Sequence, residues 1–447
     1  MGNKNELSSF DLIVLGAGGS GLVAGLSAAE SGAEVLIIER TGAFGGHTLE
    51  TQGMFPVANS KLQLQQGFDF PPEQIFNDIM RLNHGEADPE LVMELCKQSG
   101  KVADWFADYV GLRLIPVTEF KYYGYTKFSI VSPAGRSGSE LVTAMRKKAE
   151  SLPNLTIVTG RKAKLKKDNV SGELFVVIEG TDELLRSKKI VIATGGFGAN
   201  KQFLSSYIPN AMNLKYFGSS FHDGTAVSIA KDLGFQLSSM DSYQAHSSLS
   251  GVGTLVSWES VLKGSIIINS QGSRFADEKI GYSEYASKLS PQEGGFGYEL
   301  IPDEIYSEMY DLYSDFRLTA AHGGFKLCNT IDEVADYTGA YRKNLRESVD
   351  FLAENIRQNS VRDFRIFPLH CVKIFPALFH TLGGIKTDRF MRAIEVGGET
   401  SRIVYAVGDA AAGISGHGST GYLSGSGLLM AIVGGYIAGK HATGKLQ

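Results

Sequence analysis

Two tyrosines stand in sequence surroundings that suit proton transfer. Tyr422 lies among the small residues 416–425, which offer few other binding groups, and Tyr282 follows the charged run 274–278. A phenol has a pKa of about 10 in water, so it can donate a proton, or act as a base where positive surroundings lower that pKa. Donors that hold a ketone oxygen make the neighbouring C–H group acidic. A hydrogen-bonded loop tyrosine is the structural alternative at both positions.

A glycine-rich loop near the start has the context of a dinucleotide site. Residues 10–15 form a short apolar run, and the glycine pattern of residues 16–21 follows at once. Residues 22–31 are rich in Ala and Leu and predict a helix, and residues 34–39 predict a second strand. The order of strand, glycine loop, helix and strand turns a weak motif into a specific one.

Each glycine of this loop has a physical role. Gly16 permits the tight turn, Gly18 lets the backbone approach a pyrophosphate, and Gly21 allows close helix–strand contact. The helix N-terminus would face the phosphates. Glu39 ends the second strand and can accept hydrogen bonds from ribose hydroxyls. An acid here favours FAD or NAD over a phosphorylated ribose.

The pattern along the chain predicts a Rossmann-like α/β fold in two parts with an α+β insertion. Residues 155–193 predict paired strands that end in Ala-Thr-Gly-Gly, where such a domain returns to its cofactor. We expect the first part of the nucleotide domain at 1–202, an inserted lobe at 203–360 and the second part at 361–447.

Composition indicates an ordinary globular protein of about two to three domains. The chain has 447 residues, 43% hydrophobic and 20% charged, and a net charge of −5, which gives no reason to expect nucleic acid or a membrane surface as partner. Cys96, Cys328 and Cys371 are too widely spaced for a metal site or disulfide framework. The start is polar, and the apolar run 428–438 fits a buried helix, so we expect a cytoplasmic protein without membrane insertion.

Over nearly its whole length the chain resembles one family. This family comprises the flavoprotein subunits of fumarate reductase and succinate dehydrogenase, with the related 3-ketosteroid dehydrogenases and urocanate reductases. The resemblance implies a two-part FAD-binding domain, a capping domain at 203–360 and an active site between them. The markers, specific only together, are the loop 16–21 with Glu39, the runs 45–48, 193–196, 222–224, 269–278 and 380–384, and the run 407–409.

The resemblance also implies which residues contact FAD. Gly45, Gly46 and Thr48 are similar to the loop beside the isoalloxazine ring, Ala163 to the adenine contact, and Asp409 to the acid that holds the ribityl chain. The predicted FAD contacts are Gly16, Gly18, Gly19, Ser20, Gly21, Glu39, Arg40, Gly45, Gly46, His47, Thr48, Gly53, Ala163, Ala193, Thr194, Gly195, Asp223, Gly408, Asp409, Gly427 and Leu428.

His47 raises the question of covalent flavin. Membrane-bound members of the family attach FAD to a histidine in a His-Thr-apolar run followed closely by glycine, and residues 47–53 have that spacing. Soluble members usually carry another polar residue there and bind FAD non-covalently. We expect non-covalent FAD with His47 packed against the flavin, and covalent attachment at His47 is the alternative.

The chain departs from fumarate reductases at two arginine positions. The window 279–285 holds Tyr282 in place of the proton-donating arginine, and Tyr422 replaces the arginine that grips the second carboxylate. Without this bidentate grip we do not expect fumarate reduction. The 3-ketosteroid dehydrogenases are more similar here: Tyr282 would be the proton base, Tyr422 O–H with the Gly425 N–H would polarise the ketone, and Ser424 could relay a proton. The spacing from Tyr422 to Gly425 is one residue shorter than usual.

Two further features bear on the substrate. In the dicarboxylate and urocanate members, a histidine matching His380 touches a substrate carboxylate, which suggests a ketone that also carries an acid. A purely structural histidine is the alternative. Tyr122, Tyr123 and Tyr125 could line the pocket, or form a surface hairpin.

These features predict an FAD-dependent oxidoreductase acting on CH–CH groups. The expected reaction is desaturation of a cyclic ketone, such as 4-oxocyclohexanecarboxylate or a 3-ketosteroid, to the α,β-unsaturated ketone. The reverse reaction, enone or enoate reduction, is the first alternative, and a flavin protein without net redox turnover is the second. The chain has no second nucleotide loop, haem motif or cysteine cluster, so we expect an external electron acceptor.

Overall fold

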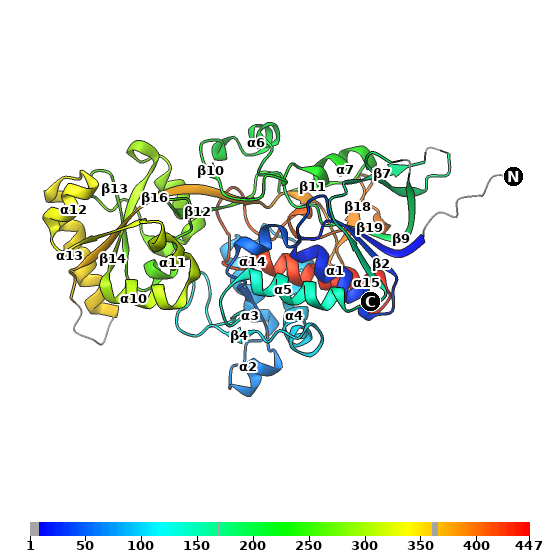
Figure 1. The fold of residues 1–447 in the computed structure, drawn as a ribbon, viewed down its shortest axis with the longest axis horizontal. Coiled ribbons are helices and arrows are strands. Elements are labelled where there is room, and N and C mark those ends of the chain that lie inside the picture. The colour runs from blue at the N-terminus through cyan, green and yellow to red at the C-terminus, as the bar shows by residue number, and fades with distance from the viewer. Residues whose placement is uncertain (1–8, 169, 182, 360–364) are drawn as a thin grey trace.

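The computed structural model describes residues 9–168, 170–181, 183–359 and 365–447. Two lobes lie side by side (Figure 1). One lobe is built on an eight-stranded sheet and the other on a six-stranded sheet. The first part of the chain and its last helix belong to the same lobe.

The eight-stranded sheet is mostly parallel. Its strands are β1 Ser9–Leu15, β2 Val35–Ile38, β6 Leu155–Val158, β7 Ala163–Lys167, β8 Leu174–Ile178, β9 Leu184–Ile192, β18 Arg392–Ile394 and β19 Thr400–Ala406. The main order is β18-β19-β9-β1-β2-β6, with β8 paired to β9 and β7 paired to β8. Residues 12–15 and 35–38 are all buried, as expected of parallel strands covered on both faces.

Two helices fix the glycine loop against this sheet. Helix α1 (Gly19–Glu30) packs against α15 (Gly434–Ala442), and the two lie together in Figure 1. The approach is close because α15 carries glycines at the contact. A Cβ on Gly435 would lie 2.5 Å from the Ser20 carbonyl oxygen, and one on Gly439 would lie 2.3 Å from the Ala24 carbonyl oxygen. Larger residues would push the helices apart and move the start of α1.

The second lobe is organised by one long strand. Its strands are β10 Lys215–Tyr216, β12 Tyr243–Ser250, β13 Ile266–Asn269, β14 Gly297–Pro302, β15 Phe325–Cys328 and β16 Leu369–Thr381. β16 pairs antiparallel with β12, β14 and β15. The helices around them are α8 Glu259–Leu262, α9 Tyr282–Leu289, α10 Asp303–Leu312, α11 Ser314–Ala321, α12 Ile331–Thr338 and α13 Arg342–Asn359.

The remaining helices and strands lie outside these two sheets. The helices are α2 Lys61–Gln65, α3 Pro72–Leu82, α4 Pro89–Trp105, α5 Gly138–Glu150, α6 Lys201–Tyr207, α7 Thr225–Leu233 and α14 Ser426–Leu428. The strands are β3 Phe55–Pro56, β4 Ile115–Pro116, β5 Ile130–Ser132, β11 Leu237–Ser238 and β17 Gly384–Ile385. Single turns of 3-10 or π type include η1 Gly46–Glu50, η2 Phe106–Val110, η4 Glu278–Ile280, η6 Gly408–Ala410 and η7 Leu429–Val433.

The predicted α/β fold with an inserted lobe is confirmed. The first strand, the helix after the glycine loop and the second strand form β1, α1 and β2, and the apolar run 428–438 forms the buried turns before and within α15. The domain boundaries stay a prediction. β16 belongs to the sheet of the second lobe although it follows the expected boundary at residue 360.

Among the described residues, no helix combines the length and the apolar character that crossing a membrane requires.

The second lobe has a core of its own, which leads to a stability prediction. Leu352 on α13 is fully buried in it, whereas Leu318 on α11 is 50% exposed. Leu352→Ala should lower the free energy of unfolding by about 2–5 kcal/mol, because it removes buried methyl groups and leaves a cavity. Leu318→Ala should leave it nearly unchanged. Chemical denaturation of both variants checks this, and equal effects would contradict it.

Candidate active site

A cavity of about 670 Å³ lies where the two lobes meet. Its wall includes Gly16 at the end of β1, His246 on β12 and His380 on β16, so both sheets contribute to it. This volume falls within the range of small-molecule and cofactor sites. Most of the predicted site residues line it. The exceptions are Gly21, Gly45, Gly53 and Asp223.

The backbone around the glycine loop is packed so closely that a side chain at Gly16 or Gly21 would collide with it. Gly16 has a φ of +108°, and a Cβ there would lie 2.3 Å from the Ala193 carbonyl oxygen. A Cβ on Gly21 would lie 2.0 Å from the Gly16 carbonyl oxygen, so Gly21 supports the turn from behind. Gly18 caps α1, and the free N–H groups at the start of the helix can bind a phosphate.

Glu39 is held in place by two backbone donors. The Ala17 N–H donates to Oε2 and the Thr41 N–H donates to Oε1, each at 2.8 Å. Each oxygen keeps a free lone pair, so the carboxylate can still accept a hydrogen bond from a ligand hydroxyl.

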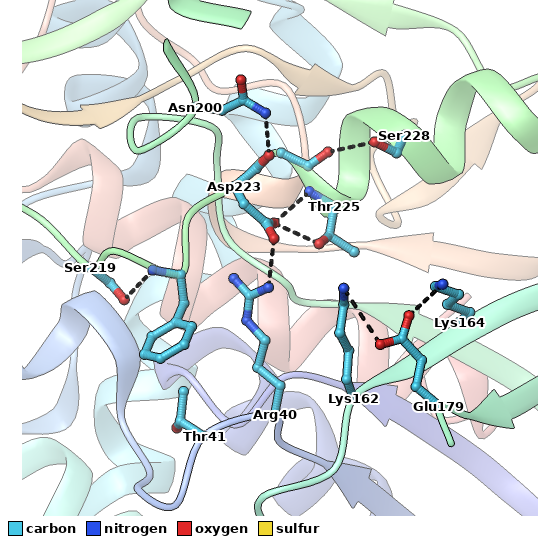
Figure 2. Close-up of polar contacts among 12 residues, drawn as sticks. Arg40, Thr41, Lys162, Lys164, Glu179, Asn200, Ser219, Asp223, Thr225 and Ser228 are labelled. Carbon is cyan, nitrogen blue, oxygen red and sulfur yellow. Dashed lines mark hydrogen bonds and ion pairs between the residues drawn. The ribbon is translucent and has the colours of Figure 1, made fainter. Parts of the chain in front are cut away.

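Arg40, the residue after Glu39, places a positive charge at this part of the cavity wall. Arg40 forms an ion pair with Asp223 at 2.8 Å, and Figure 2 shows the guanidinium group pointing toward this carboxylate. The Thr225 N–H and hydroxyl also donate to Asp223, at 3.1 and 2.7 Å. Burial acts to raise the pKa of Asp223, but the Thr225 and Arg40 hydrogen bonds outweigh it and the pKa is lowered. Asp223 therefore acts behind the cavity wall, by holding Arg40.

A histidine cluster surrounds the half-buried carboxylate of Asp409 further along the cavity. His380 Nδ1 lies 2.9 Å from Asp409 Oδ1. The His47 ring lies 5.6 Å from that of His222 and 5.8 Å from that of His380. Ligand atoms of His47, His222 and Asp409 lie within 4.8 Å of one another. Burial, and then repulsion by His380 and His222, lower the pKa of His47 to about 3, so its imidazole is neutral. Burial opposes ionisation of Asp409, but the imidazoles lower its pKa.

Tyr282 and Tyr422 meet in the same cavity. Their ring centroids are 6.1 Å apart, and the Tyr282 hydroxyl lies within hydrogen-bonding reach of the Tyr422 oxygen. The Tyr282 ring stacks on His246 at 4.5 Å, and Tyr422 meets His380 edge to face at 5.9 Å. These ring contacts fix the orientation of both phenols.

Both phenols keep their protons at neutral pH. Burial and then the neighbouring Tyr422 raise the pKa of Tyr282 well above its usual range. Burial raises the pKa of Tyr422 to about 12, although the Gly427 N–H acts against this. The positive surroundings that would lower the Tyr282 pKa and favour its role as a base are therefore not present among the described residues, and that role stays a prediction.

The Gly425 N–H is expected to act with the Tyr422 hydroxyl on the ketone oxygen. Gly425 lines the cavity, and this role stays a prediction. The Tyr422 oxygen lies next to Gly427, where a Cβ would be 3.0 Å from it. Ser424 lines the cavity near Tyr282, and its carbonyl oxygen accepts a hydrogen bond from Tyr125 at 2.5 Å.

The sequence did not identify part of the wall near Tyr282. Gln244 and His246 come from β12, and Trp258 and Glu259 come from the start of α8. No local motif marks them, because they reach the cavity through strand pairing and lobe packing. Tyr122 lines the cavity as suggested. The other two tyrosines suggested for the pocket lie differently: Tyr125 is buried beside Ser424, and Tyr123 is 44% exposed.

The fold and the cavity together define an FAD-dependent oxidoreductase that acts on carbon–carbon bonds. The chain belongs to the family described as FAD binding domain, whose model matches residues 11–428.

Three similar proteins illustrate the range of the family. The chain is 25% identical over 449 residues to the probable fumarate reductase Ifc3 of Shewanella frigidimarina, covering 96% of this chain and 74% of that protein. It is 22% identical over 552 residues to 4-oxocyclohexanecarboxylate 2-dehydrogenase of Sinomonas cyclohexanicum, covering 98% and 93%. The solved 3-ketosteroid-Δ4-(5α)-dehydrogenase of Rhodococcus jostii RHA1 superposes with a TM-score of 0.72 at 21% identity, covering 99% of this chain and 98% of that one.

The cavity fits FAD on three observations. A Cβ on Gly18 would have only the Gly45 carbonyl oxygen within 4 Å, at 4.0 Å, so the absence of a side chain leaves open space at this cavity wall, and Glu39 keeps acceptor capacity for a ribose. In addition, Arg40 Nη2 and Thr194 Oγ1, both on residues that line the cavity, are buried without a hydrogen-bond partner. Buried polar atoms normally have partners, so these atoms are suited to a bound ligand.

The crowding at Gly16 leads to a prediction about cofactor retention. Gly16→Ala should weaken FAD binding by at least about tenfold, because its Cβ cannot fit against Ala193. Gly32→Ala is the matched control, since Gly32 also has a positive φ (+87°) but nothing lies within 4 Å of its Cβ position. Titrating apoprotein with FAD compares the variants. Equal losses in both would show that backbone strain, and not the contact with Ala193, governs retention.

Proposed function

We propose that this enzyme desaturates a cyclic ketone to the α,β-unsaturated ketone. The observation that supports this best is the pair Tyr282 and Tyr422, whose ring centroids lie 6.1 Å apart on one cavity wall. No described lysine or arginine lines this part of the wall, so a dicarboxylate would lack the bidentate partner it needs. A ketone needs donors for one oxygen and an acceptor for one proton.

We further propose how the chain holds FAD. The glycine loop and the start of α1 would bind the pyrophosphate, and Glu39 would bind the ribose. The loop at Gly46 to Thr48 and the turn at Asp409 would lie beside the flavin, with His47 packed against it and non-covalent binding favoured. Bound FAD supplies the acceptor for a hydride leaving the substrate carbon.

The phenols would divide the remaining work. Tyr422 is held between His380 and the Gly427 N–H, so its hydroxyl proton can be donated to the ketone oxygen. That hydrogen bond makes the α-hydrogen acidic. Tyr282 would take the α-proton, with Ser424 beside it as the group that can pass the proton on. The two electrons of the hydride would leave through an external acceptor.

Reduction of an enone or enoate is the second candidate, and one observation favours it. The pKa of Tyr282 is raised, so at neutral pH this phenol holds a proton that it can donate to a substrate carbon. Reduction uses the same groups in reverse, and the redox potential of the flavin decides between the directions. The similarity to proteins named as fumarate reductases supports this candidate as well.

The role of Tyr282 can be tested by removing one oxygen atom. Tyr282→Phe should keep FAD bound but slow the anaerobic bleaching of flavin absorbance by a reactive cyclic ketone at least about a hundredfold, the usual contribution of a positioned base. Tyr285→Phe is the matched control. Tyr285 lies on the same helix, and its buried hydroxyl has no hydrogen-bond partner.

Stopped-flow bleaching measures both variants against a screen of cyclic ketones. Unchanged bleaching in Tyr282→Phe would remove Tyr282 from the mechanism. A similar loss in Tyr285→Phe would attribute the effect to packing of α9.

The direction of the reaction has its own pH signature. Desaturation needs the deprotonated form of Tyr282, whose pKa is raised, so below that pKa the bleaching rate should increase about tenfold per pH unit. Reduction needs the protonated form, so reoxidation of reduced flavin by an enone should stay constant from pH 6 to 9. Measuring both half-reactions over this range checks the assignment. A bleaching rate that does not rise with pH would exclude Tyr282 as the base.

A further inference from the structure

Glu259 is a buried acid in the cavity wall that the proposed reaction does not use. It begins α8, is 1% exposed and lines the cavity together with Trp258 and Tyr282. The Tyr122 hydroxyl donates a hydrogen bond to Glu259 Oε1. The Oε2 atom is buried and has no hydrogen-bond partner. An unpaired buried polar atom beside a cavity is suited to contact a ligand.

The groups around Glu259 do not supply a positive charge. Asp315 and Glu299 lie nearby, and their carboxylates accept hydrogen bonds from Ser257 and Ser260. Arg136 is directed elsewhere, because it donates to the Tyr313 hydroxyl and to Glu119 at 2.6 Å each.

This setting keeps Glu259 in its acid form at neutral pH. Burial first, and then repulsion by Asp315 and Glu299, raise the pKa of Glu259 to about 8. Hydrogen bonds to its carboxylate from its own backbone N–H and from the Gln52 side chain act to lower this pKa but do not outweigh the burial. A protonated carboxyl group is a hydrogen-bond donor as well as an acceptor. At neutral pH Glu259 can therefore donate a proton in a hydrogen bond to a ligand oxygen.

Permanent positive charge is confined to the other end of the cavity. Arg40, Arg161 and Lys162 are the lysine and arginine residues among the described lining residues. Arg161 is attached to the Glu39 end, because its N–H donates to the Glu39 carbonyl oxygen at 3.0 Å. Lys162 is next to it in the chain, and Figure 2 shows it in the same region as Arg40.

The histidines near the tyrosines do not replace this charge. Burial lowers the pKa of His246 to about 3, so its ring is neutral. His380 is engaged by the Asp409 carboxylate, which balances any charge it carries. A carboxylate bound between Glu259 and Tyr282 would lose water without gaining a counter-charge.

We propose that Glu259 selects uncharged substrates, by donating a hydrogen bond to a carbonyl or hydroxyl oxygen remote from the reacting ketone and by disfavouring a carboxylate there. This inference rests on the proposed function and narrows the class of substrate that the enzyme would accept. It favours neutral ketones over keto acids such as 4-oxocyclohexanecarboxylate.

The test uses two ligands that differ only at one end, where one carries a carboxylate and the other its uncharged methyl ester. The purified holoenzyme is titrated with 4-oxocyclohexanecarboxylate and with its methyl ester, and the perturbation of FAD absorbance gives the affinity for each without requiring turnover. The ester should bind at least about tenfold more tightly at pH 7. Its affinity should fall about tenfold by pH 9, because ionisation of Glu259 removes the donor.

Variants assign the effect to Glu259. Glu259→Gln keeps a donor but cannot ionise, so ester affinity should stay near the wild-type value at pH 7 and no longer fall by pH 9. Glu259→Leu should lower ester affinity about fivefold at pH 7. Glu299→Gln is the control, since burial raises its pKa to about 8 as well but it does not line the cavity. It should retain the fall with pH, displaced to somewhat lower pH because repulsion by Glu299 no longer raises the pKa of Glu259.

Three results would overturn the proposal: equal or tighter binding of the acid, no binding of either ligand, or an unchanged pH profile in Glu259→Gln. Failure of the proposed function looks different. In that case the ester binds with the expected pH profile, but no ketone bleaches the flavin and no enone reoxidises it.

Discussion

The contact between His380 and Asp409 joins the two lobes at the point where chemistry would occur. His380 is carried by β16, the long strand that organises the second lobe, and Asp409 lies in the turn after β19 of the first lobe. Thr381, the last residue of β16, also accepts a hydrogen bond from the Phe197 N–H at 2.9 Å. The end of β16 is therefore fixed to the first lobe on two sides. The position of Tyr422 against His380, and of Tyr282 against Tyr422, follows from this attachment.

Local spacing was enough to predict the nucleotide half of the cavity. The Gly16 to Gly21 loop and Glu39 need only neighbouring strands and one helix, and β1, α1 and β2 supply them. The chemistry of the other half depends on long-range packing. Glu259 is an ordinary glutamate in the sequence, and its acid form arises from burial and from carboxylates on separate elements. The raised pKa of Tyr282 has the same kind of origin, and no local sequence pattern indicates it.

The interior around the tyrosines combines many donors with little charge. Phenols, carboxylic acids and neutral imidazoles can exchange hydrogen bonds in several patterns, and none of them needs a counter-ion when buried. Such a chamber is well suited to recognise oxygen atoms of uncharged molecules. The arginine and lysine residues of the cavity wall are instead placed near Glu39, where Arg40 is paired with Asp223 and a phosphate-bearing cofactor would need positive charge.

The packing of α15 on α1 also constrains when the enzyme can become active during its synthesis. The elements that form the glycine loop are made several hundred residues before the turn at Asp409 and the helix α15 that packs against α1. Nascent chains therefore hold only half of the flavin cradle. The cavity is complete only after the early and late parts of the chain have packed together, so FAD can be fully enclosed only then.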